Sequence, residues 1–231
     1  MTARTVRAVV CSIYFNAMKS LRHYSHAAFT LIELLVVIAI MIVLAGMITA
    51  VGPAVINRAS KVQAASDVNQ IVGGVKGYYT DYGQYPLTPT QQTDGANNKD
   101  AVFGSGSVNN DVLFNALRGT DGSANGGVAN PRAIAYLQPR DAKDASNPKS
   151  GVAPTGSNKA GQWFDPWGMP YVVFIDANYD NQLDIKSVYI AAKTPLRVDV
   201  GAASFGVDKQ VGYKGDGNYL SSGCDDVLSW R

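Results

Sequence analysis

The residue with the clearest chemical demand is Glu33, an acid near the start of a long apolar run. No other charge lies between Phe29 and Arg58. A carboxylate inside such a segment costs on the order of 2.5 kcal/mol or more unless it is paired. Cleavage before Phe29 would create a free amine, and a neighbouring copy of the chain could present that amine to Glu33. The residues therefore predict an ion pair between subunits, with an ordinary anchor helix that places Glu33 at the membrane interface as the alternative.

Two further groups of acids have the chemistry of cation ligands. Asp225 and Asp226 are adjacent and repel each other unless a cation lies between them, although two exposed acids near a chain end are the simpler interpretation. Residues 176–184 carry side-chain oxygens at alternate positions, as calcium loops do. The twelfth-position Glu of that loop is replaced by Ser187, so a solvated hairpin turn is favoured there.

Catalytic chemistry has little support in this sequence. The only histidines are His23 and His26, and no nucleophile stands in an evident pattern with a base. Asp165 has no evident catalytic partner. We therefore expect a protein without enzymatic activity. A membrane-tethered hydrolase stays open as an alternative that hydrolytic activity dependent on Asp165 would favour.

The charge distribution predicts which side of a membrane the chain faces. The first 28 residues hold four basic side chains and no acid, which should keep the N-terminus in the cytoplasm. The remainder has 16 basic and 18 acidic residues, so nothing indicates a nucleic-acid-binding protein. Only Cys11 and Cys224 are present, and removal of the first 28 residues would leave no internal disulfide.

One long helix must position Glu33. From Leu34 to Val51 the apolar run has about 18 residues, which spans roughly 27 Å as a helix and predicts a single membrane crossing. Helical periodicity continues beyond it, and we expect one helix from about residue 30 to residue 79, with a kink at Pro53. Its packed face is predicted to comprise Val62, Ala65, Val68, Ile71, Val72 and Val75.

The rest of the chain reads as loops and a small sheet. Residues 87–161 are rich in Gly, Asn and Ser, with one short helix capped by Asp111 and a mobile surface loop over 141–161. Strands are predicted at 171–175, 185–191 and 202–205, as an antiparallel sheet against the long helix. Between Gly161 and the first strand, Asp165, Pro166 and Gly168 predict a tight turn, from which Trp167 fastens the sheet to the helix. Trp230 is expected to pack on the sheet. The fold class is therefore α+β.

The N-terminal pattern resembles the processing site of type IV pilins and of the pseudopilins of type II secretion. The resemblance lies in the basic leader, the small residue Ala28, the sequence Phe29-Thr-Leu-Ile-Glu33 and the apolar run that follows. It implies that a prepilin peptidase cleaves between Ala28 and Phe29 and methylates the new Phe29 amine, and that Glu33 pairs with a neighbour's N-terminus. Ala28 replaces the usual Gly, and the 28-residue leader is long, so we expect Met18 to be the true start.

Two C-terminal patterns resemble the major pseudopilin. One is the turn from Asp165 to Gly168, followed by Pro170-Tyr171. The other is the end of the chain, where the resemblance implies a structural calcium ion bound by the side chains of Asp208, Asp225 and Asp226 and by the backbone carbonyls of Phe205 and Gln210. Lys209 in place of a usual Gly, and a longer insertion over 211–223 in which Asp216 could substitute as a ligand, depart from that pattern.

The resemblance implies a structural subunit of a periplasmic filament. Its partners would be further copies of itself, minor pseudopilins, the prepilin peptidase and methyltransferase, and an inner-membrane platform with its ATPase. The protein would cross the inner membrane once, with its C-terminal part in the periplasm. The alternative is a type IV pilin of a surface pilus, which the missing cystine disfavours. We divide the chain into segments 1–28, 29–57, 58–86, 87–162 and 163–231.

Overall fold

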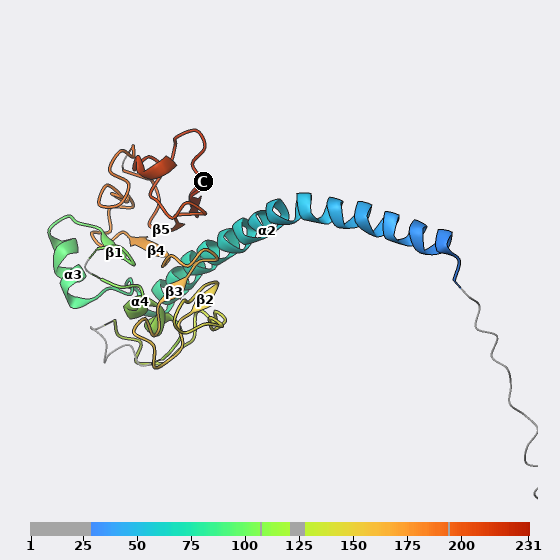
Figure 1. The fold of residues 1–231 in the computed structure, drawn as a ribbon. Coiled ribbons are helices and arrows are strands. Elements are labelled where there is room, and N and C mark those ends of the chain that lie inside the picture. The colour runs from blue at the N-terminus through green and yellow to red at the C-terminus, as the bar shows by residue number, and fades with distance from the viewer. Residues whose placement is uncertain (1–28, 107, 121–127, 194) are drawn as a thin grey trace, which may run out of the picture. The chain divides into compact units, whose positions relative to one another are not determined.

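The computed structural model describes residues 29–106, 108–120, 128–193 and 195–231, although not the side chains of residues 49–53. The predicted leader, residues 1–28, therefore lies outside the described residues. The chain divides into two compact units, the first ending at Val51 and the second running from Gly52 to Arg231. The second unit carries the sheet and all of the buried core (Figure 1).

A 52-residue helix, α2 (Leu31–Tyr82), is the longest element. It ends at Tyr82, three residues later than the sequence predicted, and the next residue, Gly83, has a left-handed φ of 68° that glycine adopts at little cost. The Gly83 amide donates to the Tyr79 carbonyl at 2.8 Å and closes the last turn. The predicted kink at Pro53 stays a prediction, because it falls where the two units join.

The remaining elements are short. In chain order they are α3 (Pro89–Ala96), β1 (Ala101–Phe103), α4 (Asp111–Leu117), β2 (Gly151–Val152), β3 (Trp163–Phe164), β4 (Val172–Ile175), β5 (Val200–Ser204), the 3-10 turn η2 (Tyr213–Gly215) and β6 (Val227–Leu228). Four strands form one antiparallel sheet in the order β1-β4-β5-β6, while β2 and β3 pair separately. The predicted α+β class is confirmed.

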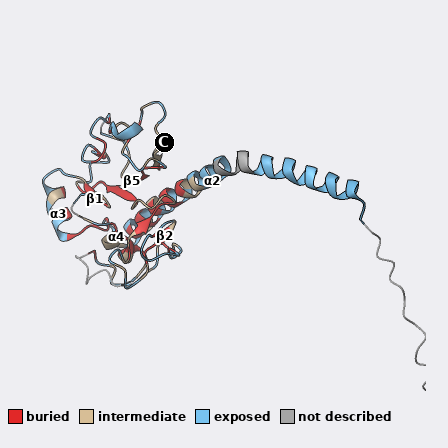
Figure 2. Cartoon of the chain, in the orientation of Figure 1, coloured by how far each residue is buried: buried red, intermediate tan, exposed pale blue. Residues whose placement is uncertain are grey.

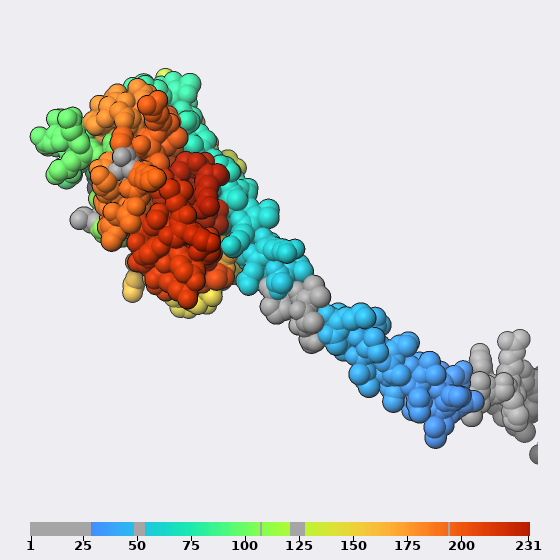
Figure 3. Space-filling view, turned by 90° about the horizontal axis from the view of Figure 1, so that it is seen from above, coloured from blue at the N-terminus to red at the C-terminus, as the bar shows by residue number. Residues whose placement is uncertain are grey.

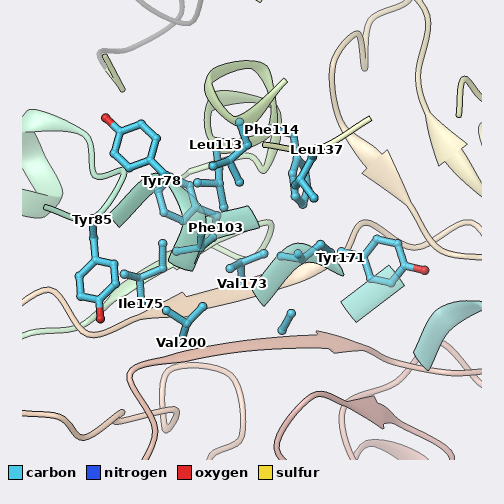
Figure 4. Packing of buried hydrophobic residues seen from close by; sticks show 14 of the residues in the cluster. Tyr78, Tyr85, Phe103, Leu113, Phe114, Leu137, Tyr171, Val173, Ile175 and Val200 are labelled. Atoms are coloured by element: carbon cyan, nitrogen blue, oxygen red, sulfur yellow. The ribbon is translucent and has the colours of Figure 1, made fainter. Parts of the chain in front are cut away.

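Side chains cover the sheet on both faces, which explains why every residue of β4 is buried. Val173 and Ile175 face a cluster that contains Val68 and Ile71 of α2 (Figure 4). Phe174 and its alternate neighbours face a second cluster, built from the loops after β4 and from the C-terminus. Burial along α2 accordingly begins only in its second half (Figure 2).

Several sequence predictions about the second unit are wrong in detail. Residues 185–191 form turns and not a strand, because Ile185 and Tyr189 are buried by neighbouring loops and not by a sheet ladder. Asp111 is the first helical residue of α4 and not its cap. Val62 of α2 is 71% exposed and lies outside the core. The 141–161 loop is tied down by the pairing of β2 with β3.

Trp163, and not the predicted Trp167, packs between the sheet and the helix. Trp163, 3% exposed, packs edge-on against Phe114 and Tyr171 in the core under α2, whereas Trp167 is only half-buried. The predicted packing of Trp230 on the sheet is confirmed, because its ring lies so close to Gly201 that a Cβ there would meet it at 2.9 Å.

Tyrosines at the end of α2 anchor the following loops. Tyr78 donates to the carbonyl of Ala129, and Tyr82 donates to Asn130 Oδ1 at 2.7 Å. Tyr85 stacks between Tyr79 and Tyr179, with ring centroids at 4.6 and 5.3 Å. This stretch therefore fastens the following loops to the end of α2.

The turn at Asp165 is built around a fully buried carboxyl group. Asp165 Oδ1 accepts from the amides of Trp167 and Met169 at 2.9 and 2.8 Å, and Oδ2 accepts from Ser204 Oγ at 2.6 Å. Gly168 has φ 91°, as the turn requires. Asp165 and Ser204 are both fully buried, so the pair joins this turn to β5 and cannot reach a substrate.

Replacing Asp165 with Ala should destabilise the fold strongly. The change leaves the buried donors of Trp167, Met169 and Ser204 without an acceptor, at a cost of about 3 kcal/mol. Asp144 provides a matched control, since its Oδ1 accepts from the amides of Ser146 and Asn147 in the same kind of turn on the surface. Urea denaturation of residues 58–231 should show a large loss for Asp165→Ala and a much smaller one for Asp144→Ala. Equal losses would contradict the structural role of Asp165.

Candidate functional site

Thr30 and Glu33 form a reciprocal hydrogen-bonded cap at the start of α2. The Glu33 amide donates to Thr30 Oγ1 at 3.2 Å, and Glu33 Oε2 accepts from the amide and hydroxyl of Thr30 at 3.2 and 3.0 Å. This is a capping box, which the spacing Thr-x-x-Glu indicates in the sequence although no cap was predicted there. The cap fixes one carboxylate oxygen at the helix N-terminus, where the helix dipole also favours a negative charge.

The geometry leaves the other oxygen, Oε1, without a hydrogen bond to any described residue. Glu33 is exposed in the isolated chain, and Phe29 is 76% exposed. Ala28, the residue on the other side of the predicted cleavage site, lies outside the described residues. The site can therefore accept a cation from another molecule without losing the contacts that hold Glu33 to Thr30.

The helix that follows Glu33 is apolar on every side and has no cover. Residues Leu31–Ile48 form the one span in the described part of the chain that is long and apolar enough to cross a membrane. Its large side chains are all exposed, for example Leu31 at 82% and Ile48 at 71%. Such a surface requires lipid or the helices of other subunits as its surroundings.

The predicted C-terminal ligands lie close together in the chain's last loops. Asp225 Oδ2 accepts from the amides of Val207 and Asp208. Asp208 Oδ1 accepts from the amide of Gln210 at 2.9 Å, so a hydrogen-bonded turn connects two of the predicted ligands. Phe205 is buried at the end of β5, next to this turn. In Figure 3 the C-terminal segment lies against the adjoining part of α2.

Asp226 has the most unusual surroundings of these acids. Its Oδ2 accepts from the Gly212 amide at 2.9 Å, whereas Oδ1 is buried without a hydrogen-bond partner among the described residues. The Tyr189 hydroxyl and the Cys224 thiol lie beside this carboxyl, but neither has the geometry of a full hydrogen bond to Oδ1. Burial raises the pKa of Asp226, and the charge of Asp225 adds to this effect. An unsatisfied buried oxygen next to a second carboxylate is the kind of environment that a cation relieves.

Side-chain acids alone do not surround a metal position here. Among the described residues, no group of three or more His, Cys, Asp or Glu side chains has the spacing of a metal site. Backbone carbonyls would have to complete any calcium sphere, as the resemblance implies for Phe205 and Gln210. Asp216, the suggested substitute ligand, already accepts from the amides of Tyr213 and Asn218 at 2.9 Å.

The oxygens of the 176–184 loop are used within the loop. Asp176 accepts from the amides of Asp180 and Asn181 at 3.2 and 2.7 Å, and Asp180 accepts from the Gln182 amide at 2.9 Å. Tyr179 and Asn181 have positive φ values of 61° and 60°. The loop is therefore a tight, solvated turn, which agrees with the favoured interpretation of its sequence.

Comparison with known proteins gives a match for the N-terminal segment alone. The Prokaryotic N-terminal methylation motif matches residues 24–49, which include Phe29, Glu33 and most of the apolar span. No curated protein and no solved structure matches the chain. The matched motif is a prepilin-type signal, which implies processing by a prepilin peptidase and assembly into a filament. The chain therefore carries the N-terminal signal of type IV pilin-like filament subunits, a class that includes both pilins and pseudopilins.

Proposed function

We propose that this protein is a structural subunit of a type II secretion pseudopilus. It is anchored in the inner membrane by α2, is cleaved and methylated before Phe29, and is assembled by a platform protein and an ATPase into a periplasmic filament with minor pseudopilins. The observation that carries the proposal is the prepilin-type signal, with Glu33 held by Thr30 at the start of an uncovered apolar helix. The protein has no catalytic role in this account.

Two features of the second unit, which we call the head (Gly52–Arg231), favour a pseudopilus over a surface pilus. The turn at Asp165 resembles that of the major pseudopilin, and it joins β5 to the region below α2 through Ser204. Cys224 is a free thiol, so hydrogen bonds and ring packing hold the C-terminal loops where many pilins have a cystine. Filaments found outside intact cells would instead indicate a surface pilus.

Glu33 is well placed to set the axial position of each incoming subunit. In a low-dielectric helix bundle a charged carboxylate is costly, and a methylated ammonium from a neighbour offsets that cost only when the two subunits are in one register. The cap with Thr30 fixes the carboxylate beforehand, so less side-chain entropy is lost on pairing.

The mature N-terminus is the first test of this proposal. Mass spectrometry of the protein from its host membranes should give a chain that begins with N-methylated Phe29, because the matched motif contains the processing signal. An unprocessed chain, or a cut at another position, would contradict the assignment.

Substitutions at Glu33 separate its charge from its capping role. Glu33→Gln keeps an oxygen that can accept from Thr30 but removes the charge, whereas Thr30→Ala weakens the cap and keeps the charge. In a strain that lacks the native copy, Glu33→Gln should reduce filament formation about as severely as Glu33→Ala, and Thr30→Ala should have a smaller effect. Normal filaments from Glu33→Gln would show that the charge is not required.

We also propose that a calcium ion stabilises the C-terminal loops. Asp208, Asp225 and Asp226 would hold it together with the carbonyls of Phe205 and Gln210. The buried Oδ1 of Asp226, which lacks a partner among the described residues, supports this proposal. When bound, the ion would offset the repulsion between the two adjacent acids and connect β5 to the last strand.

Chelation tests the calcium proposal. Thermal melting of residues 58–231 with saturating calcium should give a midpoint at least about 5 °C higher than with chelator, because a ligand bound only by the folded state stabilises it. Asp226→Asn should abolish most of that difference, whereas Asp180→Asn, in the solvated 176–184 turn, should preserve it. An identical midpoint with calcium and with chelator would contradict a structural calcium ion.

A further inference from the structure

A basic hollow lies beside strand β2. It has a volume of about 540 Å³, and its charged lining is formed by Arg140, Lys143 and Lys149 together with Asp141 and Asp144. Asp144 keeps its charge and accepts from the amides of its own turn, whereas Asp141 pairs with Arg118 at 3.8 Å, so the basic side chains at the hollow outnumber the acids. The hollow therefore presents an excess of positive charge to solvent.

The basic side chains of this hollow lack acidic partners within the described part of the chain. No ion pair is formed there by Arg140, Lys143 or Lys149. Arg140 donates through Nε to the Ser150 carbonyl at 2.6 Å, and its charge also acts on the nearby Asp67 carboxyl, so Lys143 and Lys149 supply the positive charge that is free for a partner. The hollow is thus a basic concave surface suited to an acidic partner.

The convex counterpart on the same molecule is the turn 176–184. Asp180 and Asp184 are exposed on it, and the amide contacts made by Asp176 hold the turn in one conformation. The Asp184 amide donates to Asp100 Oδ2 at 2.6 Å, which brings a further acid beside the turn. Asp100, Asp180 and Asp184 therefore gather acidic side chains at this turn, and Asp180 and Asp184 are the two exposed to solvent.

The turn and the hollow cannot meet within one molecule. The turn lies beside α3, where Ala177 is packed against Gly95, whereas the hollow adjoins β2. In Figure 1, α3 and β2 are on opposite sides of α4. A contact between such different surfaces is heterologous and repeats from copy to copy, as a filament requires.

We propose that the 176–184 turn of one subunit docks into the basic hollow of the next subunit in the filament. This contact rests on the proposed filament function and adds the head-to-head interface to it. Asp180 and Asp184 face Lys143 and Lys149 across the interface, and the contact specifies which neighbour is accepted. It is exposed to solvent at its rim, so salt weakens it.

Charge exchange tests this contact in the full chain. Lys143→Glu with Lys149→Glu should lower filament yield about tenfold, since like charges then oppose each other across the interface. Asp180→Lys with Asp184→Lys should do the same, and all four changes together should restore the yield to within about twofold of the original chain. Lys193→Glu, an exposed lysine outside the hollow, is the control and should leave the yield unchanged.

Cross-linking provides a second test that does not depend on yield. In a chain whose native cysteines are replaced by Ser, Lys149→Cys and Asp180→Cys on separate copies should form disulfide-linked dimers in filaments, and Lys193→Cys with Asp180→Cys should not. Filaments that form normally but give neither the charge rescue nor the cross-link would overturn the contact alone. Failure of the original chain to form any filament would overturn the proposed function, and this contact with it.

Discussion

The constraint on which the rest of this structure depends is the placement of one carboxylate in the otherwise uncharged first half of α2. Glu33 can be accommodated at the start of α2 because Thr30 satisfies one of its oxygens. The remaining oxygen needs a cation to offset its charge in apolar surroundings. The apolar side chains that follow are exposed and need lipid or other helices to cover them. Packing of several copies through these helices would meet both needs at once.

The second unit gives that helix a stable head without a cystine. The second half of α2 supplies one wall of the first cluster, and the sheet cannot separate from the helix without exposing that cluster. The second cluster covers the opposite face of β4. The buried turn at Asp165 and the ring of Trp230 on Gly201 fix the two ends of β5 to its surroundings. The last loops depend on amide contacts to Asp225 and Asp226, where a bound cation would add most.

The features that the sequence predicts well are those with a strong local signal. The apolar run and its continuing periodicity predict α2, and the apolar runs of β4 and β5 predict two of the strands. Strand β1 has only three residues and pairs with β4 some 70 positions away, so no local pattern indicates it. Residues 185–191 have the composition of a strand but form turns, because loop packing buries Tyr189 against Tyr219 and Trp230.

The candidate sites likewise combine features that a local sequence pattern predicts with features that depend on contacts between distant residues. The position of Glu33 follows from the motif, and its cap follows from a spacing visible in the sequence. Ser204 as partner of Asp165, and the orphaned oxygen of Asp226, depend on chain segments that only folding brings together. Trp163 and Trp167 are four residues apart, and burial alone decides which of them fastens the core.

The most direct measurement of the central claim is a cryo-electron microscopy map of the assembled filament that resolves the N-terminal helices. If the ion pair joins neighbouring subunits, the Phe29 nitrogen of one subunit will lie within ion-pair distance, about 4 Å, of the Glu33 carboxylate of its neighbour. A map in which Glu33 contacts only its own Thr30, with every neighbouring N-terminus elsewhere, would contradict it.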